Sequence, residues 1–258
     1  MSQAMQSSLL TLTVLEHVAV HQPVRVAEVA EALGKPKSTV QRALVTLREA
    51  GWIRPDGSEW TRWVLTPRVL DVARGAANEH GLHDAAYAPL DQVRRESRES
   101  GILAVRDESD WVVVDYLEGL RPVQVRVEIG RRFPLHAGAA GKAILAFLPS
   151  SEIDELLGSE LRAFTERTIT SPVLLREELA RIRELGYAYS ECEVSSGIHS
   201  IAAPVFDRDG GVIASMSLTI PESRLGSHTP ELAAQLVAAA ASVTSQLRPR
   251  LAVGTPSR

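Results

Sequence analysis

The clearest pattern of apolar and polar positions lies near the start of the chain, where two short runs have helical spacing. Over residues 26–33, apolar side chains recur at the i, i+3, i+4 and i+7 positions of one helix face, and Gly34 ends the run. After a turn at residues 34–36, a second run again places its apolar residues on one face: Val40, Ala43, Leu44 and Leu47. Two short helices joined by a tight glycine-containing turn predict a helix-turn-helix, whose second helix lies in the major groove of DNA.

A short hairpin is predicted directly after these helices. Residues 52–54 and 60–65 are strand-like, and Pro55-Asp56-Gly57-Ser58 between them is a strong turn signal. A hairpin that follows a helix-turn-helix is a wing. Its anchors to the core are expected to be Trp63 and Leu65.

Residues 67–100 are rich in alanine and charge and contain no strand-like run. We interpret this stretch as two helices broken near Gly81. Their apolar stripes are too thin for a domain core, so residues 68–98 are predicted to form a helical linker that also makes dimer contacts. An exposed linker helix is the alternative.

The rest of the chain alternates between strand-like and helical segments. Six segments have the length and apolar pattern of strands: 102–106, 111–119, 123–130, 187–194, 198–206 and 212–220. Residues 207–211 are a hairpin turn between the last two. Helices are predicted at 141–149, 151–157, 172–185 and 228–247. The predicted fold class is α+β: a winged helix-turn-helix domain (1–67), the linker (68–98), and a C-terminal domain (99–258) with a mainly antiparallel sheet flanked by helices.

The charge distribution agrees with this division. The 258 residues have a net charge of −4 and a pI of about 6.0, which argues against a protein that is basic throughout. Residues 1–68 nevertheless hold eight cationic and six acidic side chains, so a mildly basic segment precedes an acidic body. The chain has a single cysteine, no secretory signal and no apolar run near the roughly 18 residues of a membrane span. We therefore expect a cytoplasmic protein with no membrane partner.

The polar residues of the second helix suit contact with DNA. Lys37, Ser38 and Thr39 lie at its N-terminus, where side-chain donors and backbone N–H groups meet phosphate oxygens. One turn further, Gln41 and Arg42 are of the types that contact base edges. The alternative is that these residues only solvate the outer face of a helical hairpin. In the wing, Arg62 either reaches a phosphate or the minor groove, or is a solvated surface arginine.

Three stretches, residues 34–52, 134–149 and 186–207, resemble the IclR family of bacterial transcriptional regulators, and the resemblance runs across nearly the whole chain. The third stretch matches the family signature at its spaced positions: Gly186, Ser190, Glu193, Ser200, Ile201, Ala202, Val205, Phe206 and Asp207. The resemblance implies a connecting helix and a GAF-like effector domain behind the winged helix-turn-helix. It also implies a homodimer or dimer of dimers on a roughly palindromic double-stranded operator, controlled by a small organic effector, often a carboxylic or aromatic acid. We expect a repressor of a catabolic operon that needs no cofactor.

An effector site is expected around residues 138–142, where small residues precede an apolar run and leave backbone N–H groups open for an anion. Close helix packing is the alternative explanation for the small residues. A P-loop is not expected, because the Walker spacing GxxxxGK followed by Ser or Thr is absent and Ala143 occupies the hydroxyl position. Carried over from the family, the pocket comprises the backbone of two residues, four hydroxyl side chains and two apolar walls: Ala140 and Gly141, then Ser190, Ser200, Ser217 and Thr219, then Val125 and Phe133.

Some relatives have an aspartate and a cysteine where this chain has Ser190 and Ser200, so its pocket is richer in hydroxyls. Because a hydroxyl both donates and accepts, a neutral amide or phenolic group would fit as readily as an acid.

Other classes of function fit the sequence less well. A metal site lacks paired His or Cys spacing, so His136 is expected to be a hydrogen-bonded structural residue and Glu193 a strand residue that fixes the loop. An enzyme is not expected, because Cys192 is flanked by two carboxylates and no GxSxG elbow is present. A cytosolic small-molecule-binding protein or hydrolase whose winged helix binds another protein remains the alternative, and salt dependence distinguishes it from a DNA-binding protein.

Overall fold

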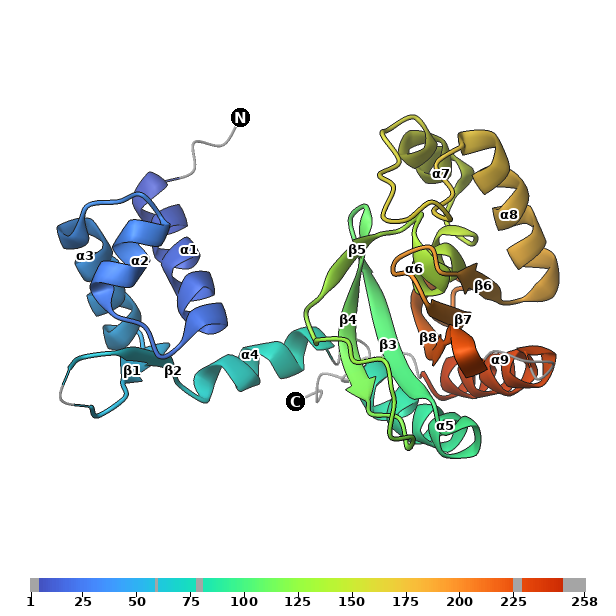
Figure 1. Ribbon diagram of the computed structural model, residues 1–258, viewed down its shortest axis with the longest axis horizontal. Coiled ribbons are helices and arrows are strands. Elements are labelled where there is room, and N and C mark those ends of the chain that lie inside the picture. The colour runs from blue at the N-terminus through green and yellow to red at the C-terminus, as the bar shows by residue number, and fades with distance from the viewer. Residues whose placement is uncertain (1–4, 59, 78–80, 225–228, 248–258) are drawn as a thin grey trace, which may run out of the picture. The chain divides into compact units, whose positions relative to one another are not determined.

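The computed structural model of the chain describes residues 5–58, 60–77, 81–224 and 229–247 (Figure 1). The described residues form two compact units that divide between Ala76 and Ala77. We describe each unit separately. No described helix is both long and apolar enough to cross a membrane.

The smaller unit is a helix-turn-helix followed by a two-stranded wing. Its elements in chain order are α1 (Gln6–His21), α2 (Val26–Ala32), α3 (Lys37–Glu49), β1 (Ile53–Pro55), β2 (Trp63–Leu65) and α4 (Arg68–Ala77), whose last residue is counted with the larger unit. Gly34 has a φ of +59°, and this left-handed conformation turns the chain from α2 into α3. The two predicted helices and the wing are confirmed. Strand β1 extends one residue into the predicted turn.

The wing is attached to the core as predicted. Ile53 pairs with Leu65, and the Trp63 N–H donates to the Val24 carbonyl at 2.8 Å. Trp63 is buried beside the apolar faces of α1, α2 and α3, and Leu65 packs against the same cluster. The wing is therefore held in place by this core.

The larger unit is an antiparallel sheet between two helical layers. Its elements are α5 (Leu82–Ser97), β3 (Ser100–Asp107), β4 (Asp110–Leu117), β5 (Arg132–Pro134), α6 (Gly138–Leu145), α7 (Ser150–Leu157), α8 (Pro172–Leu185), β6 (Ala188–Glu191), β7 (Ile198–Phe206), β8 (Val212–Pro221), η2 (Glu222–Arg224) and α9 (Thr229–Gln246). The strands are ordered β5-β4-β3-β8-β7-β6. Helices α6, α7 and α8 cover one face and α5 and α9 cover the other, each over its own apolar cluster (Figure 1).

One predicted strand, 123–130, is wrong. The edge of β4 pairs instead with residues 130–134: the Gly130 N–H donates to the Val113 carbonyl at 2.7 Å, and β5 continues the pairing. In the rejected segment, the Val125 carbonyl accepts hydrogen bonds from the side chains of Ser100 (2.8 Å) and Tyr116 (2.9 Å) rather than from a strand. The alternation of this segment is therefore that of an extended loop with one side against the domain.

Other bounds also differ from prediction. Residues 82–97 of the predicted linker form α5, whose buried residues belong to an apolar core cluster of the larger unit. Helix α6 begins at Gly138, three residues before the predicted 141, and ends at Leu145. Strand β6 ends at Glu191, because Cys192 turns the chain with a φ of +55°. Glu193 is therefore a loop residue and not a strand residue. Residue 228, the predicted first residue of the last helix, and residues 78–80 of the predicted linker lie outside the described part of the chain.

Candidate functional site

The polar face of α3 is open to solvent along its first turns. Its opposite face buries the four predicted apolar residues. Lys37, Ser38, Gln41 and Arg42 are exposed and Thr39 is half-buried. No side chain within the described residues caps the N-terminus of α3, whose N-cap is Pro36. The helix N-terminus is therefore available to an external acceptor such as a phosphate.

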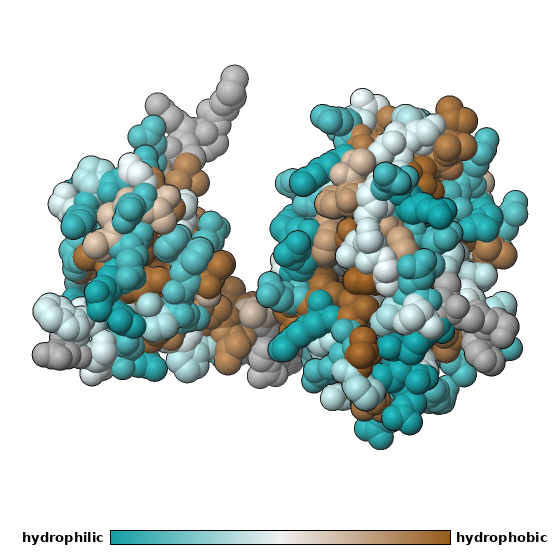
Figure 2. Space-filling view, in the orientation of Figure 1, coloured by the Kyte–Doolittle hydropathy of each residue, from teal (hydrophilic) through white to brown (hydrophobic). Residues whose placement is uncertain are grey.

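Arg62 lies in the wing and is half-buried. Hydrogen bonds from Ser58, helped by the nearby positive charge of Arg62, hold the pKa of Asp56 below its usual value. Arg62 thus faces an acidic partner inside the wing as well as solvent. Hydrophilic residues cover much of the visible surface of this unit (Figure 2).

A cavity of about 400 Å³ lies in the larger unit between the sheet, the N-terminus of α6 and the loop 125–131. Seven of the eight predicted effector residues line it: Val125, Phe133, Ala140, Ser190, Ser200, Ser217 and Thr219. Gly141 does not. Figure 2 shows apolar side chains gathered in the middle of the visible face of this unit, between hydrophilic margins.

The floor of the cavity is hydroxyl-rich. Ser190, Ser217 and Thr219 are all at least nine-tenths buried. The Ser200 hydroxyl accepts a long hydrogen bond of 3.4 Å from the Ala139 N–H. The Thr219 hydroxyl has no hydrogen-bond partner among the described residues. A buried hydroxyl without a partner is costly, so this one is available to a ligand.

An aromatic wall and a charged rim complete the cavity, and the sequence did not single out most of these residues. The Trp111 and Phe133 rings are stacked with centroids 4.6 Å apart. The Arg131 guanidinium lies 5.4 Å from the centroid of the Phe133 ring, and Arg126 and Glu128 line the same rim. The charged positions of 123–130 were visible in the sequence but were assigned to a strand.

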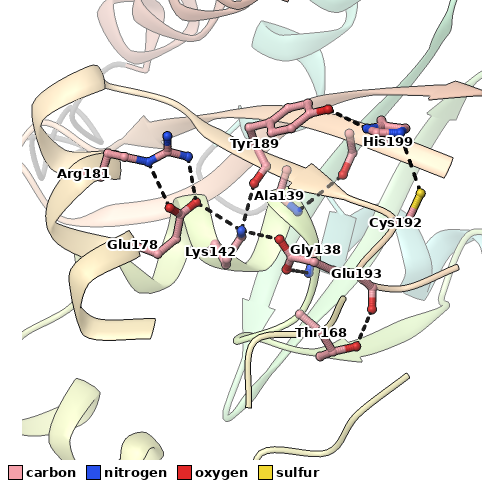
Figure 3. A network of polar contacts seen from close by, with 12 residues as sticks. Gly138, Ala139, Lys142, Thr168, Glu178, Arg181, Tyr189, Cys192, Glu193 and His199 are labelled. Atoms are coloured by element: carbon pink, nitrogen blue, oxygen red, sulfur yellow. Dashed lines mark hydrogen bonds and ion pairs between the residues drawn. The ribbon is translucent and has the colours of Figure 1, made fainter. Parts of the chain in front are cut away.

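The N-terminus of α6 already holds a carboxylate. The Gly138 N–H donates to Glu193 Oε2 at 3.2 Å, and Lys142 Nζ donates to Glu193 Oε1 at 2.5 Å (Figure 3). Lys142 is 1% exposed and also donates to Glu178 (3.2 Å) and to the Tyr189 carbonyl (2.8 Å). Burial raises the pKa of Glu193, and the Lys142 charge opposes this shift. The network fixes the loop after β6 to α6, a role of Lys142 that sequence reasoning missed.

Gly141 is a packing residue. A Cβ built at this position would lie 2.5 Å from Trp111 Cδ1 and 2.6 Å from the Leu135 carbonyl oxygen. Because α6 begins at Gly138, Gly141 is also past the first turn, whose N–H groups are the open ones. Of the two residues expected to form the anion seat, Ala140 therefore lies in the first turn of α6 and Gly141 does not.

The remaining titratable residues lie away from the cavity. His136 Nε2 is 3.0 Å from the Arg162 carbonyl, which confirms the structural role, and burial lowers its pKa. Cys192 Sγ is 3.6 Å from His199 Nε2 (Figure 3). Successive residues of a strand point to opposite faces, so His199 faces away from the cavity that its neighbour Ser200 lines.

Comparison with known proteins identifies the domain family of each unit. Residues 11–57 match the IclR helix-turn-helix domain, and residues 75–245 match the bacterial transcriptional regulator IclR C-terminal domain. The chain is 32% identical to the Transcriptional repressor IclR of Escherichia coli K12 over 225 residues, covering 86% of this chain and 82% of that protein. It is 30% identical to the E. coli HTH-type transcriptional regulator KdgR over 246 residues, covering 95% and 93%.

Solved structures agree with the fold. The Thermotoga maritima IclR structure matches with a TM-score of 0.80 and 26% identity, over 95% of this chain and 99% of that one. An IclR homolog from Microbacterium hydrocarbonoxydans, solved in complex with 4-hydroxybenzoate, matches with a TM-score of 0.83 and 23% identity, over 94% and 99%. At that identity, the second likeness concerns the fold alone.

Proposed function

The chain belongs to the IclR family of bacterial transcriptional regulators, and from this premise we propose that it represses transcription from a roughly palindromic operator until a small aromatic carboxylic acid occupies the cavity. The proposed DNA binding rests on the exposed polar face of α3, whose other face is buried. This polar face carries Lys37, Ser38, Gln41 and Arg42. Relatives named Transcriptional repressor IclR and Acetate operon repressor support repression. Such a protein works in the cytoplasm. It binds as a homodimer or dimer of dimers, because two-fold symmetry of the protein matches paired half-sites in the DNA.

The cavity supports the choice of an aromatic acid. Its volume of about 400 Å³ lies within the range of small-molecule sites. The Trp111 and Phe133 rings line the cavity and supply aromatic surface for contact with another ring, while Arg126 and Arg131 at the rim supply positive charge. The buried Thr219 hydroxyl, which has no hydrogen-bond partner within the described part of the chain, would bond a polar substituent. The effector is therefore proposed to be planar, anionic and substituted with a hydrogen-bonding group.

The DNA half is tested by anisotropy titration of the protein's own upstream intergenic DNA and a scrambled duplex over a series of salt concentrations. Arg42→Ala should cost about 1–3 kcal/mol on the operator and relax sequence preference, because it removes a base contact. Lys37→Ala should weaken binding to both duplexes alike and flatten the salt slope by about 1. If neither variant differs from wild type, α3 is not the recognition helix. A lack of preference over scrambled DNA at every salt concentration would favour the adaptor alternative.

The effector half is tested with three matched compounds in the same assay. 4-Hydroxybenzoate should release the operator, 4-hydroxybenzamide tests the need for charge, and 4-hydroxycyclohexanecarboxylate tests the need for a planar ring. We expect the acid to act at concentrations at least tenfold below the other two. Equal action of the amide would instead support the neutral ligand that the hydroxyl-rich floor also accommodates.

Two buried hydroxyls of β8 provide a matched pair of variants. Thr219→Val keeps the shape of the side chain but removes the hydroxyl, and should weaken the effector about fivefold, the value of one hydrogen bond. It should leave the melting temperature unchanged or higher, because the hydroxyl has no hydrogen-bond partner among the described residues. Ser215→Ala removes another buried hydroxyl for which the described residues offer no hydrogen-bond partner. Ser215 does not line the cavity, so this variant should leave effector affinity unchanged. Equal losses in the two variants would show that the effect is structural.

A further inference from the structure

Three side chains of metal-ligating type come together behind the cavity. Cys192 follows β6, His199 lies in β7, and Glu222 follows β8. Their ligand atoms lie within 4.8 Å of one another: Cys192 Sγ is 3.6 Å from His199 Nε2, which is 4.0 Å from Glu222 Oε1. The described residues contain this one thiol, so the proposal below rests on a mixed set of donors rather than on a cysteine motif.

The sheet register brings these residues together. His199 pairs with Glu191 on one side and with Ile220 on the other, so Cys192 and Glu222 lie just beyond its two neighbours. Backbone hydrogen bonds hold both flanking positions. The Cys192 N–H donates to the Ile198 carbonyl at 3.0 Å, and the Glu222 N–H donates to the Gly197 carbonyl at 2.8 Å. The three ligands are thus presented by a fixed backbone.

We propose that Cys192, His199 and Glu222 bind one zinc ion, with water as the fourth ligand. Thiolate, imidazole and carboxylate are the three protein ligands of zinc. With Zn–S near 2.3 Å and Zn–N near 2.0 Å, tetrahedral geometry separates S from N by about 3.5 Å, and the two atoms lie 3.6 Å apart here. Glu222 is further from His199 than the roughly 3.3 Å that zinc requires. Its carboxylate is 63% exposed and free to rotate inward.

The surroundings of His199 are those of a metal ligand. Its ring is 4% exposed, and Nδ1 lies 2.5 Å from the Tyr189 hydroxyl (Figure 3). A metal-binding histidine donates its other N–H to a fixed oxygen, which sets the tautomer and aims the free lone pair at the metal. If Nδ1–H donates to the Tyr189 oxygen, the lone pair of Nε2 faces Cys192 and Glu222.

The proposed zinc site is distinct from the effector cavity. None of its three ligands lines the cavity, although Val194 and Ser195 of the intervening loop and Ile198 at the start of β7 do. Zinc would therefore tie together the ends of three neighbouring strands and the loop that borders the effector. Its role would be to stiffen this loop, independently of whether the effector is an acid.

The test uses the full chain, purified without a histidine tag and stripped of metal with a chelator, then titrated with Co²⁺. One equivalent of Co²⁺ should produce a near-ultraviolet thiolate-to-cobalt charge-transfer band together with visible bands of tetrahedral Co²⁺, and Zn²⁺ should abolish both. Cys192→Ser should eliminate the thiolate band. His199→Gln and Glu222→Gln should weaken binding at least tenfold. Tyr189→Phe, which changes only the outer shell, should also weaken binding about tenfold.

Glu191→Gln is the matched control. Glu191 adjoins Cys192 in sequence, but its carboxylate pairs with Arg167 at 3.8 Å and lies outside the three-residue group. Its loss should change Co²⁺ affinity by less than threefold. Absence of a thiolate band in the folded wild-type protein, or its persistence in Cys192→Ser, would overturn the proposal. So would equal losses in Glu191→Gln and Glu222→Gln. Circular dichroism of each metal-free variant separates loss of binding from loss of folding.

Discussion

Substituting Gly141 with alanine separates the two roles that the small residues of α6 can have. A glycine kept for a ligand's approach to the backbone would tolerate a methyl group without loss of stability. Alanine favours a helix by about 1 kcal/mol over glycine, so Gly141→Ala would then stabilise the protein. If the glycine is instead required for close packing, Gly141→Ala would destabilise the protein.

The structure favours packing, and the geometry sets the size of the effect. The added methyl group would lie 2.5 and 2.8 Å from two atoms of the Trp111 ring and 2.6 Å from the Leu135 carbonyl oxygen. Neither is the free end of a flexible chain, because Trp111 Nε1 donates to the Ala137 carbonyl at 3.0 Å and its ring stacks on Phe133. Overpacking costs about 1–3 kcal/mol, and the short contacts indicate the upper end. Subtracting the roughly 1 kcal/mol by which alanine favours the helix leaves a net destabilisation of about 2 kcal/mol.

Urea unfolding followed by circular dichroism measures this change, and hydrogen exchange of peptides from α6 and β4 locates it. A destabilisation of about 2 kcal/mol lowers the melting temperature of a unit of this size by about 4–8 °C. Gly158→Ala is the control. Gly158 caps α7 in a right-handed conformation, and its added Cβ would meet only carbonyl oxygens at 3.4 Å. It should change stability by less than about 1 kcal/mol. A Gly141→Ala protein as stable as the control would refute the packing argument.

Three further variants probe the buried charges. Lys142→Met should destabilise the protein by about 3 kcal/mol or more in urea, because it leaves the buried Glu193 without its cation. His136→Gln should reduce the acid sensitivity of stability. Burial lowers the pKa of His136 in the folded state, so below about pH 6.5 the unfolded state binds more protons and wild-type stability falls. The difference in melting temperature between wild type and His136→Gln should therefore narrow as the pH decreases. Glu99→Gln should cost about 2 kcal/mol, because the buried carboxylate accepts two hydrogen bonds from Arg224, at 2.6 and 2.8 Å. A pH-independent difference for His136→Gln, or no thermal shift for the other two, would contradict these assignments.

Local patterns predicted the elements that local chemistry determines. The helices at 37–49 and 172–185 show apolar periodicity, the second with a Ser171 hydroxyl that accepts from the Leu174 N–H at its start. The segment 123–130 shows the limit of such patterns. Its alternation suits a strand, yet the strand edge it would need is taken by residues 130–134. Which segment pairs with an edge depends on tertiary contacts that a local pattern does not contain.

Some residues of the candidate site could likewise be identified from a sequence pattern, whereas others depend on tertiary structure. Ser190 and Ser200 were found through the spacing of the family signature, and both line the cavity. Trp111 and Arg131 were missed, since neither carries a local signal and each reaches the cavity only through the folded sheet. The grouping of Cys192, His199 and Glu222 likewise depends on strand register, which sets three separate segments side by side.

The charges around α6 indicate how an acid would lie in the cavity. The Glu193 carboxylate already accepts from the Gly138 N–H, so a second carboxylate at the start of α6 would meet a resident negative charge. Only the long 3.4 Å hydrogen bond from Ala139 to Ser200 would be easily displaced there. The rim, in contrast, is lined by Arg126 and Arg131 together with Glu128. An aromatic acid would therefore place its carboxylate at the rim and its ring against the aromatic wall, leaving a para substituent for the hydroxyls of the floor. In this orientation an acid and its amide differ mainly at the arginines, so their affinity ratio should fall with added salt while the contribution of the floor does not.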